Sequence, residues 1–512
     1  MKRKIRWALT AVLAGSLALA GCGGGDKPAG GNAEPKTGGT LNISLDADPP
    51  KLDPAFSTAL VDRMVFQSIF DKLVDLDANG KIVPMLAEKW EVSDDQKTYT
   101  FKLRQGVKFH DGTDFNAEAV KFNFERNMDK ASTRRNELKE VDKVTVVDPY
   151  TVKVQLKQPF APFLSVLTDR AGMMVSPEAV KKYGDDFANH PVGTGPFIYK
   201  ERVKGSTITL EKNPNYWQKG LPKLDKVVYK VMTDSNVALT NLKSGQVDIT
   251  NRFPFKEIDS YKNDPKIMVV NQADQGYQGM HLNTKKPPFD KKELRQAVDL
   301  LIDRDAIVKV VLNGAGTPGH SPFAPSHFAY GDSDKYEKPN LEKAKELLKQ
   351  AGKPDGFTFT LKIGTTPQNQ QLGQMIQNML KPAGINVNLE KVEFGTLLDQ
   401  AKKGNFEAVQ LGWSGRPDPD QNIFDFVVTG GSNNYSQYSN PEVDKLLNAA
   451  RVEGDEAKRK ALYDQAMKIL NDDAEYIYFY HSNTVFGVSK AVKGFTYIPD
   501  GMIRTANLSL SK

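Results

Sequence analysis

Alternating apolar and polar residues along the chain predict a series of short strands. In Thr98–Leu103, tyrosine, phenylalanine and leucine alternate with threonine and lysine, which places the apolar side chains on one face of a half-buried strand. Two further runs flank Asp148-Pro149-Tyr150, where aspartate and proline favour a turn. The expected strands cover residues 40–45, 98–103, 144–147, 152–156, 207–210, 227–232 and 406–411.

Helical patterns lie between these strands. Asn340 precedes apolar residues at helical spacing and Gly352 follows them, as an N-cap and a C-terminal stop would. Asp290 and Glu293 have the spacing of a capping box. The expected helices cover residues from about 59 to 74 and begin near 291, 341 and 441. Because strands and helices mix throughout, we predict an α/β fold.

Local sequence motifs favour binding over catalysis. Residues 314–319 fit the dinucleotide pattern G-x-G-x-x-G, but they follow a helical pattern and include Pro318, so we expect a glycine-rich loop. Gly412-Trp413-Ser414-Gly415 lacks the second spacer of a nucleophile elbow. His320 and His327, the nearest pair of histidines, lie in a proline-rich loop and are expected at the surface. We therefore expect no catalytic residue, no metal site and no cofactor.

Composition and charge restrict the class of protein further. With 512 residues, 39% hydrophobic and 26% charged, the chain is long enough for two or three domains and resembles neither a disordered nor a polytopic membrane protein. The single cysteine excludes an internal disulfide and a cysteine-based zinc site. Basic residues are interspersed with acidic ones, so the formal charge of +6 does not indicate a nucleic-acid partner.

The first residues account for most of that charge. Lys2, Arg3, Lys4 and Arg6 precede an apolar run that is too short to span a bilayer and has the form of a secretory signal. Leu19-Ala20-Gly21-Cys22 resembles the bacterial lipobox, in which the cysteine thiol is acylated after the leader is cut. The alternative is an ordinary signal peptide with an incidental cysteine. Residues 1–21 carry four of the 69 basic residues and none of the 63 acidic ones, so the remaining chain has 65 against 63, a net charge of +2.

We predict a signal peptide at residues 1–21, lipidation at Cys22 and a flexible tether at residues 22–38. The tether is rich in glycine and contains almost no side chain to bury, so it cannot offset the entropy of ordering. Such an anchor would hold the protein on the outer side of a cell membrane without spanning it.

Longer phrases in the body carry a family resemblance. They read LAEKWEVS from Leu86, TYTFKLRQGVKFHDG from Thr98, PVGTGPF from Pro191, NPNYW from Asn213, and LNT from Leu282 with FD and RQA downstream. In this order and spacing they resemble the family 5 extracellular solute-binding proteins of ABC importers, which include peptide, glutathione and nickel binders. The resemblance covers the chain from about residue 39 onward.

The resemblance implies a bilobal fold, in which two α/β lobes enclose a ligand crevice and close about a hinge. Domain I would combine residues 38–69, 190–275 and 487–512. Domain II would be inserted as residues 70–189, and domain III, the second lobe, would be residues 276–486. Glycines 193 and 195 are expected to supply unusual backbone angles where the chain crosses between domains.

The implied function is the capture of a peptide or peptide-like solute by a monomer on the extracytoplasmic side of the membrane. Separate permease and ATPase subunits would then import the solute. Alternatives are a binder of glutathione, of another anionic amide or of a nickel chelate. A further alternative is an extracytoplasmic hydrolase, although no nucleophile and base are paired in the sequence.

The strand at 406–411 runs into a loop with tryptophan and charged residues, which is where α/β crevices bind ligands. In peptide-binding relatives an aspartate here holds the peptide's amino terminus. This chain has Arg416 at that place, or Asp418 if the alignment is shifted by two residues. Since arginine suits a carboxylate or phosphate, Arg416 is expected to anchor an anionic group of the ligand. The alternative is that Arg416 pairs with Asp418 or Asp420 and shapes the loop.

Three other residues are candidates for the ligand site. Trp413 is expected to form an apolar wall of the crevice, unless it packs in the core, and Ser414 follows it in the same loop. Thr58 lies at a helix start where relatives contact the ligand from the opposite lobe, although the neighbouring Ser57 could simply cap the helix. Residues 363–371 contain no arginine or lysine, where dipeptide binders carry an arginine for the peptide carboxylate.

Overall fold

The computed structural model of the protein describes residues 37–511. The expected signal peptide, Cys22 and all but the last two residues of the tether lie outside the described residues. Strands and helices mix along the described chain, which confirms the α/β fold class. Within residues 37–511 no helix combines the length and the apolar character that crossing a membrane requires.

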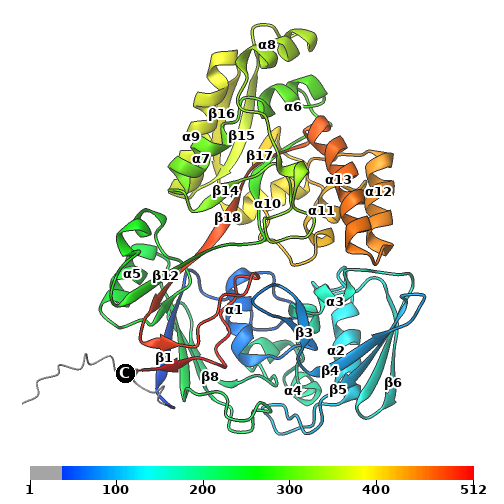
Figure 1. Ribbon diagram of the computed structural model, residues 1–512, viewed down its shortest axis with the longest axis vertical. Coiled ribbons are helices and arrows are strands. Elements are labelled where there is room, and N and C mark those ends of the chain that lie inside the picture. The colour runs from blue at the N-terminus through cyan, green and yellow to red at the C-terminus, as the bar shows by residue number, and fades with distance from the viewer. Residues whose placement is uncertain (1–36, 512) are drawn as a thin grey trace, which may run out of the picture. The chain divides into compact units, whose positions relative to one another are not determined.

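A twelve-stranded sheet extends through both lobes (Figure 1). Its strands are β1 Thr40–Leu45, β8 Phe197–Val203, β9 Thr207–Lys212, β10 Lys226–Val231, β11 Ile249–Thr250, β12 Ile267–Ala273, β13 Gln278–Leu282, β14 Gly316–Pro318, β15 Thr358–Gly364, β16 Asn386–Val392, β17 Ala408–Gln410 and β18 Tyr476–Ser489. Their order is β16-β15-β17-β13-β18-β11-β1-β10-β9-β8, with β12 and β14 also paired to β18.

Strand β18 joins the two lobes. Its first half pairs with β13 and β14, and its second half pairs with β11 and β12. The chain therefore crosses between the lobes within β18 and again between β12 and β13. The predicted domain boundary at 275/276 falls at the crossing between β12 and β13, whereas the one at 486/487 lies beyond the change of partner in β18, which occurs between Ser482 and Asn483. The division into three domains stays a prediction.

The second lobe surrounds β15, β16 and β17, which run parallel to one another. Its helices are α6 Lys292–Asp299, α7 Arg304–Val311, α8 Leu341–Gln350, α9 Pro367–Leu380, α10 Phe394–Lys402, α11 Asp420–Val427, α12 Pro441–Val452 and α13 Glu456–Asp473. Alternate residues of β15 are buried against α8 and α9 in one apolar core. Asn340 accepts a hydrogen bond from Lys343 N and caps α8, as the sequence predicts.

The other lobe contains α1 Leu60–Ile69, α5 Ser235–Lys243 and a separate antiparallel sheet. That sheet has the order β4-β5-β7-β6, and the hairpin β2-β3 lies before it in the chain. The strands are β2 Val74–Leu76, β3 Ile82–Pro84, β4 Ala87–Val92, β5 Thr98–Leu103, β6 Val141–Asp148 and β7 Thr151–Leu156. Helices α2 Ala117–Met128, α3 Phe163–Val166 and α4 Pro177–Tyr183 complete it, and a separate apolar core fills it. Short strands β19 Val492–Lys493 and β20 Ser509–Leu510 pair near the C-terminus.

The structure corrects two helix predictions. Helix α1 ends at Ile69 rather than near residue 74, because Phe70 adopts extended backbone and Val74 begins β2, which pairs with β3. The expected capping box at Asp290 is absent from α6, whose N-cap is Lys291 and has no side-chain cap.

Two glycine predictions were also wrong in part. Glycines 193 and 195 do not adopt left-handed backbone angles. They are required by close packing, since a Cβ atom at Gly193 would lie 2.2 Å from the carbonyl oxygen of Ile69. Residues 314–319 form more than a loop, because residues 316–318 are strand β14 and pair with β18.

Candidate functional site

The loop at residues 411–419 links β17 to α11 and is held in place by backbone and amide contacts. Trp413 and Tyr277 exchange two backbone hydrogen bonds, of 2.9 and 3.0 Å, which tie the loop to the crossing between β12 and β13. The side chain of Asn422, in α11, accepts from the Trp413 indole at 2.9 Å and from Arg416 N at 2.8 Å. The predicted strand and loop are therefore confirmed, and a residue of the following helix fixes the loop.

The side chain of His327 also contacts the backbone of this loop. It is buried, not exposed as the sequence suggested, and its Nε2 donates to the carbonyl oxygen of Arg416 at 2.7 Å. Its Nδ1 accepts from Ala324 N at 3.0 Å. Burial lowers the pKa of His327 to about 4, so the ring is neutral at pH 7 and can both donate and accept.

A cavity of ≈ 400 Å³ lies between the lobes beside this loop. Trp413 and Ser414 line it from the second lobe, and Leu60, Val61 and Met64 line it from α1 of the other lobe. Trp413 is half-buried, so it combines the predicted wall with packing against the apolar cluster around Phe426. A cavity of this size with one aromatic wall is typical of a small-molecule site.

The lining of the cavity is rich in uncharged polar groups. The amide side chains that reach it are those of Asn251, Gln275, Gln278, Gln368, Asn369 and Asn483. Gln368 and Asn369 belong to the stretch that lacks arginine and lysine, and they begin α9. These groups can donate to and accept from a peptide-like backbone without supplying charge.

Three charged residues also line the cavity. Arg252 pairs with Asp46, and Asp500 pairs with Arg504 at 2.7 Å. Asp274 lies between β12 and β13, and its Oδ1 accepts from Gly276 N at 2.7 Å. Burial raises the pKa of Asp274 to about 6, although the Gly276 hydrogen bond, His481 and Arg252 act to lower it.

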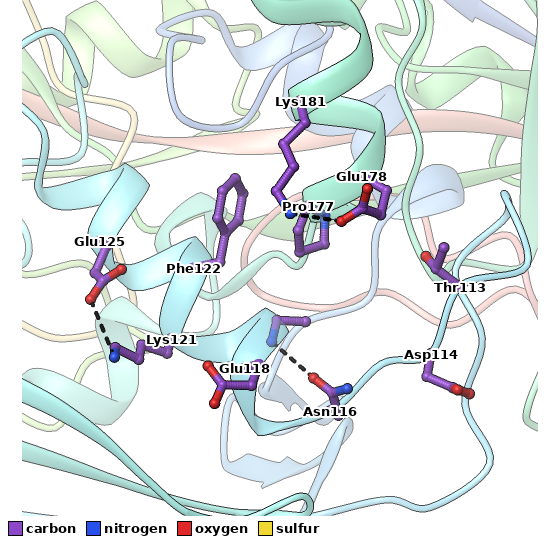
Figure 2. Close-up of a pocket in the computed structure, with 11 residues that line it drawn as sticks. Thr113, Asp114, Asn116, Glu118, Lys121, Phe122, Glu125, Pro177, Glu178 and Lys181 are labelled. Atoms are coloured by element: carbon purple, nitrogen blue, oxygen red, sulfur yellow. Dashed lines mark hydrogen bonds and ion pairs between the residues drawn. The ribbon is translucent and has the colours of Figure 1, made fainter.

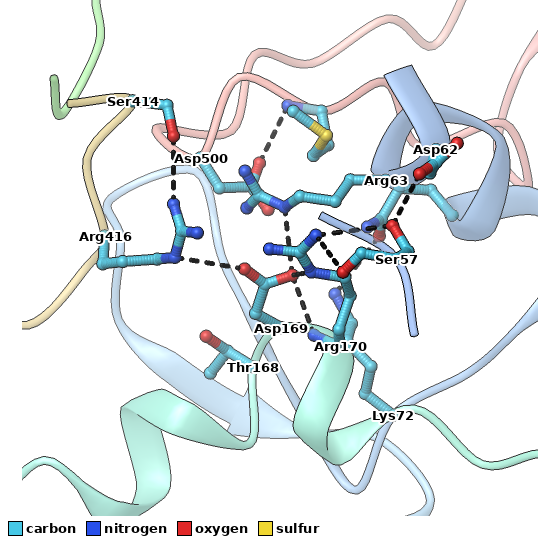
Figure 3. A network of polar contacts seen from close by, with 12 residues as sticks. Ser57, Asp62, Arg63, Lys72, Thr168, Asp169, Arg170, Ser414, Arg416 and Asp500 are labelled. Atoms are coloured by element: carbon cyan, nitrogen blue, oxygen red, sulfur yellow. Dashed lines mark hydrogen bonds and ion pairs between the residues drawn. The ribbon is translucent and has the colours of Figure 1, made fainter. Parts of the chain in front are cut away.

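Arg416 does not line this cavity, and its side chain extends toward Asp169 (Figure 3). Its Nε lies 3.5 Å from Oδ2 of Asp169, and its Nη1 donates to Ser414 Oγ at 3.2 Å and to Gly415 O at 2.6 Å. The guanidinium also stacks on the Trp413 ring, 4.5 Å from the ring centre. The described contacts of Arg416 therefore bridge the two lobes and brace the loop.

Asp169 is the centre of what we call the guanidinium cluster, formed by Arg63, Arg134, Arg170 and Arg416. Figure 3 shows three of these arginines, Arg63, Arg170 and Arg416, beside Asp169. Arg63 Nε lies 3.0 Å from Asp169 Oδ1, and Arg170 donates from Nη1 to the carbonyl oxygen of Ser57. All four arginines are at most 8% exposed. Arg63, Arg170 and Arg416 share the carboxylate of Asp169. Arg134 pairs instead with Glu137 at the edge of the cluster.

The electrostatics of the cluster follow from its burial. Burial alone would raise the pKa of Asp169, but attraction to Arg63, Arg170 and Arg416 outweighs it and holds the pKa well below the usual value. Burial lowers the pKa of Arg170 to about 9 and that of Arg416 to about 10, so both stay charged at pH 7. The cluster therefore joins the lobes through fixed charges.

Asp418 and Asp420 have partners of their own, and neither pairs with Arg416. Arg459 binds both oxygens of Asp418, at 2.9 and 2.7 Å, and Arg451 binds Asp420 at 3.0 Å. Asp418 is buried and does not line the cavity. The expected alternative for Arg416, a loop-shaping pair with either aspartate, is wrong, because these carboxylates face α12 and α13 instead.

Thr58 is exposed, and the cavity lining begins two residues later, at Leu60. Ser57 does not cap α1, whose N-cap is Ala59, but donates from Oγ to Asp62 Oδ2 at 2.7 Å. Its carbonyl oxygen accepts from Arg170 and Arg134. The start of α1 thus belongs to the guanidinium cluster.

Two further pockets lie apart from the loop at residues 411–419, and the larger, of ≈ 680 Å³, is lined by Arg304, His320 and Asp472 among others. Figure 2 shows a pocket of ≈ 460 Å³ beside α2 and α4, where Lys181 pairs with Glu178 at 2.7 Å and Lys121 with Glu125 at 3.9 Å. Within the part of the chain that the structure describes, no three His, Cys, Asp or Glu side chains are placed to hold a metal ion.

No local pattern in the sequence indicated Asp169 or Asp274. Asp169 precedes a short helical turn, and its contact with Arg416 brings together residues far apart in the chain. Asp274 lies in a short connection that resembles any polar turn. Each becomes a candidate only because the fold places it beside the loop that contains Trp413.

Comparison with known proteins identifies the family. Residues 81–436 match the model for bacterial extracellular solute-binding proteins, family 5. The glutathione-binding protein GsiB of Salmonella typhi is 35% identical over 471 residues, which cover 90% of this chain and 92% of that protein.

Two solved structures are similar over nearly the whole chain. The Helicobacter pylori periplasmic binding protein DppA, in complex with peptide STSA, has 30% identity and a TM-score of 0.84, with 93% of this chain and 99% of that chain covered. AgaA from A. tumefaciens R10, in complex with agropinic acid, has 32% identity and a TM-score of 0.81, with 92% and 99% covered. The chain belongs to the family 5 bacterial extracellular solute-binding proteins, and its fold is the bilobal fold of periplasmic binding proteins.

Proposed function

We propose that this protein is the lipid-anchored substrate-binding component of an ABC importer and captures a peptide or peptide-like solute between its lobes. The observation that supports this most directly is the cavity beside Trp413, which has contributions from both lobes and a lining of amides. The names of the relatives, which mention glutathione, a peptide and agropinic acid, favour a polar solute with amide or carboxylate groups.

Within this proposal, Trp413 and Ser414 contact the ligand directly, because both line the cavity. Arg416 acts on closure by joining Asp169 across the lobes, and Asp418 holds the loop through Arg459. Thr58 is a contact at the rim. The alternative ligands are glutathione, another anionic amide and a nickel chelate, and GsiB supports glutathione among them.

The protein acts outside the cytoplasm, as its family does. Acylation of Cys22, cleavage of residues 1–21 and a monomeric state belong to the proposal and are supported by the sequence alone. The ATP-hydrolysing and membrane-spanning subunits would be separate chains. The protein itself would perform no chemistry on its ligand, in contrast to the hydrolase alternative.

Mass spectrometry of compounds released on denaturing the purified protein tests this function. We expect a peptide or peptide-like compound. Added back at a hundredfold excess over Kd, it should increase the free energy of unfolding by about 2.7 kcal/mol and thereby raise the melting temperature. A Trp413→Ala variant prepared alongside should release less of the same compound. Conversion of the added compound to products, or a melting temperature that no peptide-like compound changes, would contradict the proposal.

A further inference from the structure

Asp274 is placed to recognise charge in the crevice. It follows β12 at the point where the chain crosses between the lobes, and it lines the cavity beside Trp413. Its backbone nitrogen donates to Ser482 O at 3.1 Å, and its Oδ1 accepts from Gly276 N at 2.7 Å. The backbone and one carboxylate oxygen are thereby fixed by the two crossing segments.

The other charged groups of the cavity are already neutralised. Arg252 is paired with Asp46, and Asp500 is held by Arg504 through two contacts of 2.9 and 2.7 Å. Among residues 37–511, no lysine, arginine or histidine nitrogen lies within 4.0 Å of Asp274. The cavity therefore presents a single carboxylate whose charge no ion pair balances.

The surroundings of Asp274 make a cation the suitable occupant. The polar groups that line the cavity with Asp274 are mostly amides and hydroxyls, such as Gln278 and Ser482, which donate hydrogen bonds but carry no charge. Arg252 and His481 act on Asp274 electrostatically but form no ion pair with it. When the lobes close and water leaves, an unbalanced carboxylate loses solvation that these groups replace only in part. A positive group of the ligand would supply the missing charge.

The geometry favours a compact cation over a guanidinium. A bidentate arginine-type contact needs both carboxylate oxygens, and Gly276 N already occupies Oδ1. A primary ammonium needs only one acceptor from the carboxylate and can donate its other hydrogens to the amides around it.

We infer that Asp274 binds a primary ammonium group of the ligand and so selects peptide-like solutes with a free amino terminus. This inference rests on the proposed function and adds to it the charge of the recognised group. It places the cation on the hinge side of the cavity, away from the loop residue Arg416, which faces the guanidinium cluster.

The test compares probes that differ only in the amino group. A mixture of tripeptides with free amino termini and the same mixture after N-acetylation are offered to the full chain, and so are glutathione and N-acetylglutathione. Equilibrium dialysis with mass-spectrometric detection measures the affinity of each. We expect the native protein to prefer the free amines by about tenfold to a hundredfold.

Two variants test whether the preference for free amines depends on the carboxylate of Asp274. Asp274→Asn keeps an oxygen for the Gly276 N–H and removes only the charge, so it should fold normally and lose the preference. Asp129→Asn removes the same charge from an exposed residue outside the cavity, and it should keep the preference.

The outcomes are separable. Equal binding of free and acetylated probes by the native protein overturns the role of Asp274 and leaves the proposed function standing, and so does a preference that persists in Asp274→Asn. Binding of neither set of probes overturns both. If Asp274→Asn fails to fold, the comparison of the two probe sets on the native protein still decides the inference.

Discussion

The loop that contains Trp413 and Arg416 separates two regions of opposite electrostatic character. On one side lies the crevice cavity, where amides predominate and where, of the two carboxylates in the lining, Asp500 forms an ion pair and Asp274 forms none with residues 37–511. On the other side lies the guanidinium cluster, where four buried arginines surround Asp169. Ser414 faces the first region and Arg416, two residues later, faces the second.

The difference shows why a high density of charge is a poor guide to the ligand site. In the guanidinium cluster the charges are buried and have protein partners, so they are suited to fixing one arrangement of the lobes. In the cavity a single carboxylate has no such partner and is available to a ligand. A charged residue without an ion-pair partner is therefore a better guide to the ligand site than a region where charged residues are most numerous.

The largest effect is expected from Asp169→Asn. This change leaves Arg63, Arg170 and Arg416 buried together without their shared counter-charge, and the removal of one partner from a buried ion pair costs about 3 kcal/mol or more. Urea unfolding should show that loss in the free energy of unfolding. The exposed Asp129→Asn, on the same domain, should change stability by less than about 0.5 kcal/mol. An Asp169→Asn variant as stable as the native protein would mean that the cluster does not depend on its carboxylate.

Local patterns in the sequence predicted the elements whose causes are local. Strand β5 follows from alternation, α8 from its apolar face and Asn340 cap, and the loop after β17 from a strand that runs into glycine and tryptophan. The family resemblance then supplied the bilobal arrangement.

Contacts between distant parts of the chain explain what the sequence did not predict. Helix α1 stops early because Val74 pairs with β3, and Gly193 is needed because Ile69 packs against it. Arg416 was singled out from its place in the loop, but its partner Asp169 comes from another domain, and no spacing in the sequence connects the two. The role of a charged residue depends on that partner.

A smaller effect is expected from Arg416→Ala. Asp169 keeps Arg63 and Arg170 as partners, so the fold should persist, but the bridge between the lobes is lost and the closed form becomes less favourable. Ligand affinity should fall by about tenfold, with equal losses for probes with free and acetylated amino groups. Calorimetry with both probes measures this.

The exposed Arg135→Ala, which removes the same type of charge from the domain that contains Asp169, is the matched control and should leave affinity unchanged. A change in the preference between the two probes on Arg416→Ala would show that Arg416 contacts the ligand, as the sequence first suggested, and would remove the distinction between the two regions.

The smallest effect is expected from pH. Burial raises the pKa of Asp274 to about 6, with His481 and Arg252 opposing that rise and Tyr480 and Tyr497 facing the same carboxylate. A bound ammonium favours the ionised form of Asp274, so protons compete with the ligand as the pH falls through 6. Well above that value the carboxylate is ionised and the affinity for the ligand reaches its full value.

Affinity for a free-amine probe should therefore be about fourfold weaker at about pH 5.5 than at about pH 7.5. Asp274→Asn should bind weakly and equally at both values, because it has no carboxylate to protonate. A fourfold change that persists in Asp274→Asn would show that Asp274 is not the group whose protonation weakens binding. The guanidinium cluster should contribute nothing in this range, because the pKa of Asp169 lies well below it and those of Arg170 and Arg416, about 9 and about 10, lie above it. A pH step in binding that Asp274→Asn removes thus reports on the crevice and not on the guanidinium cluster.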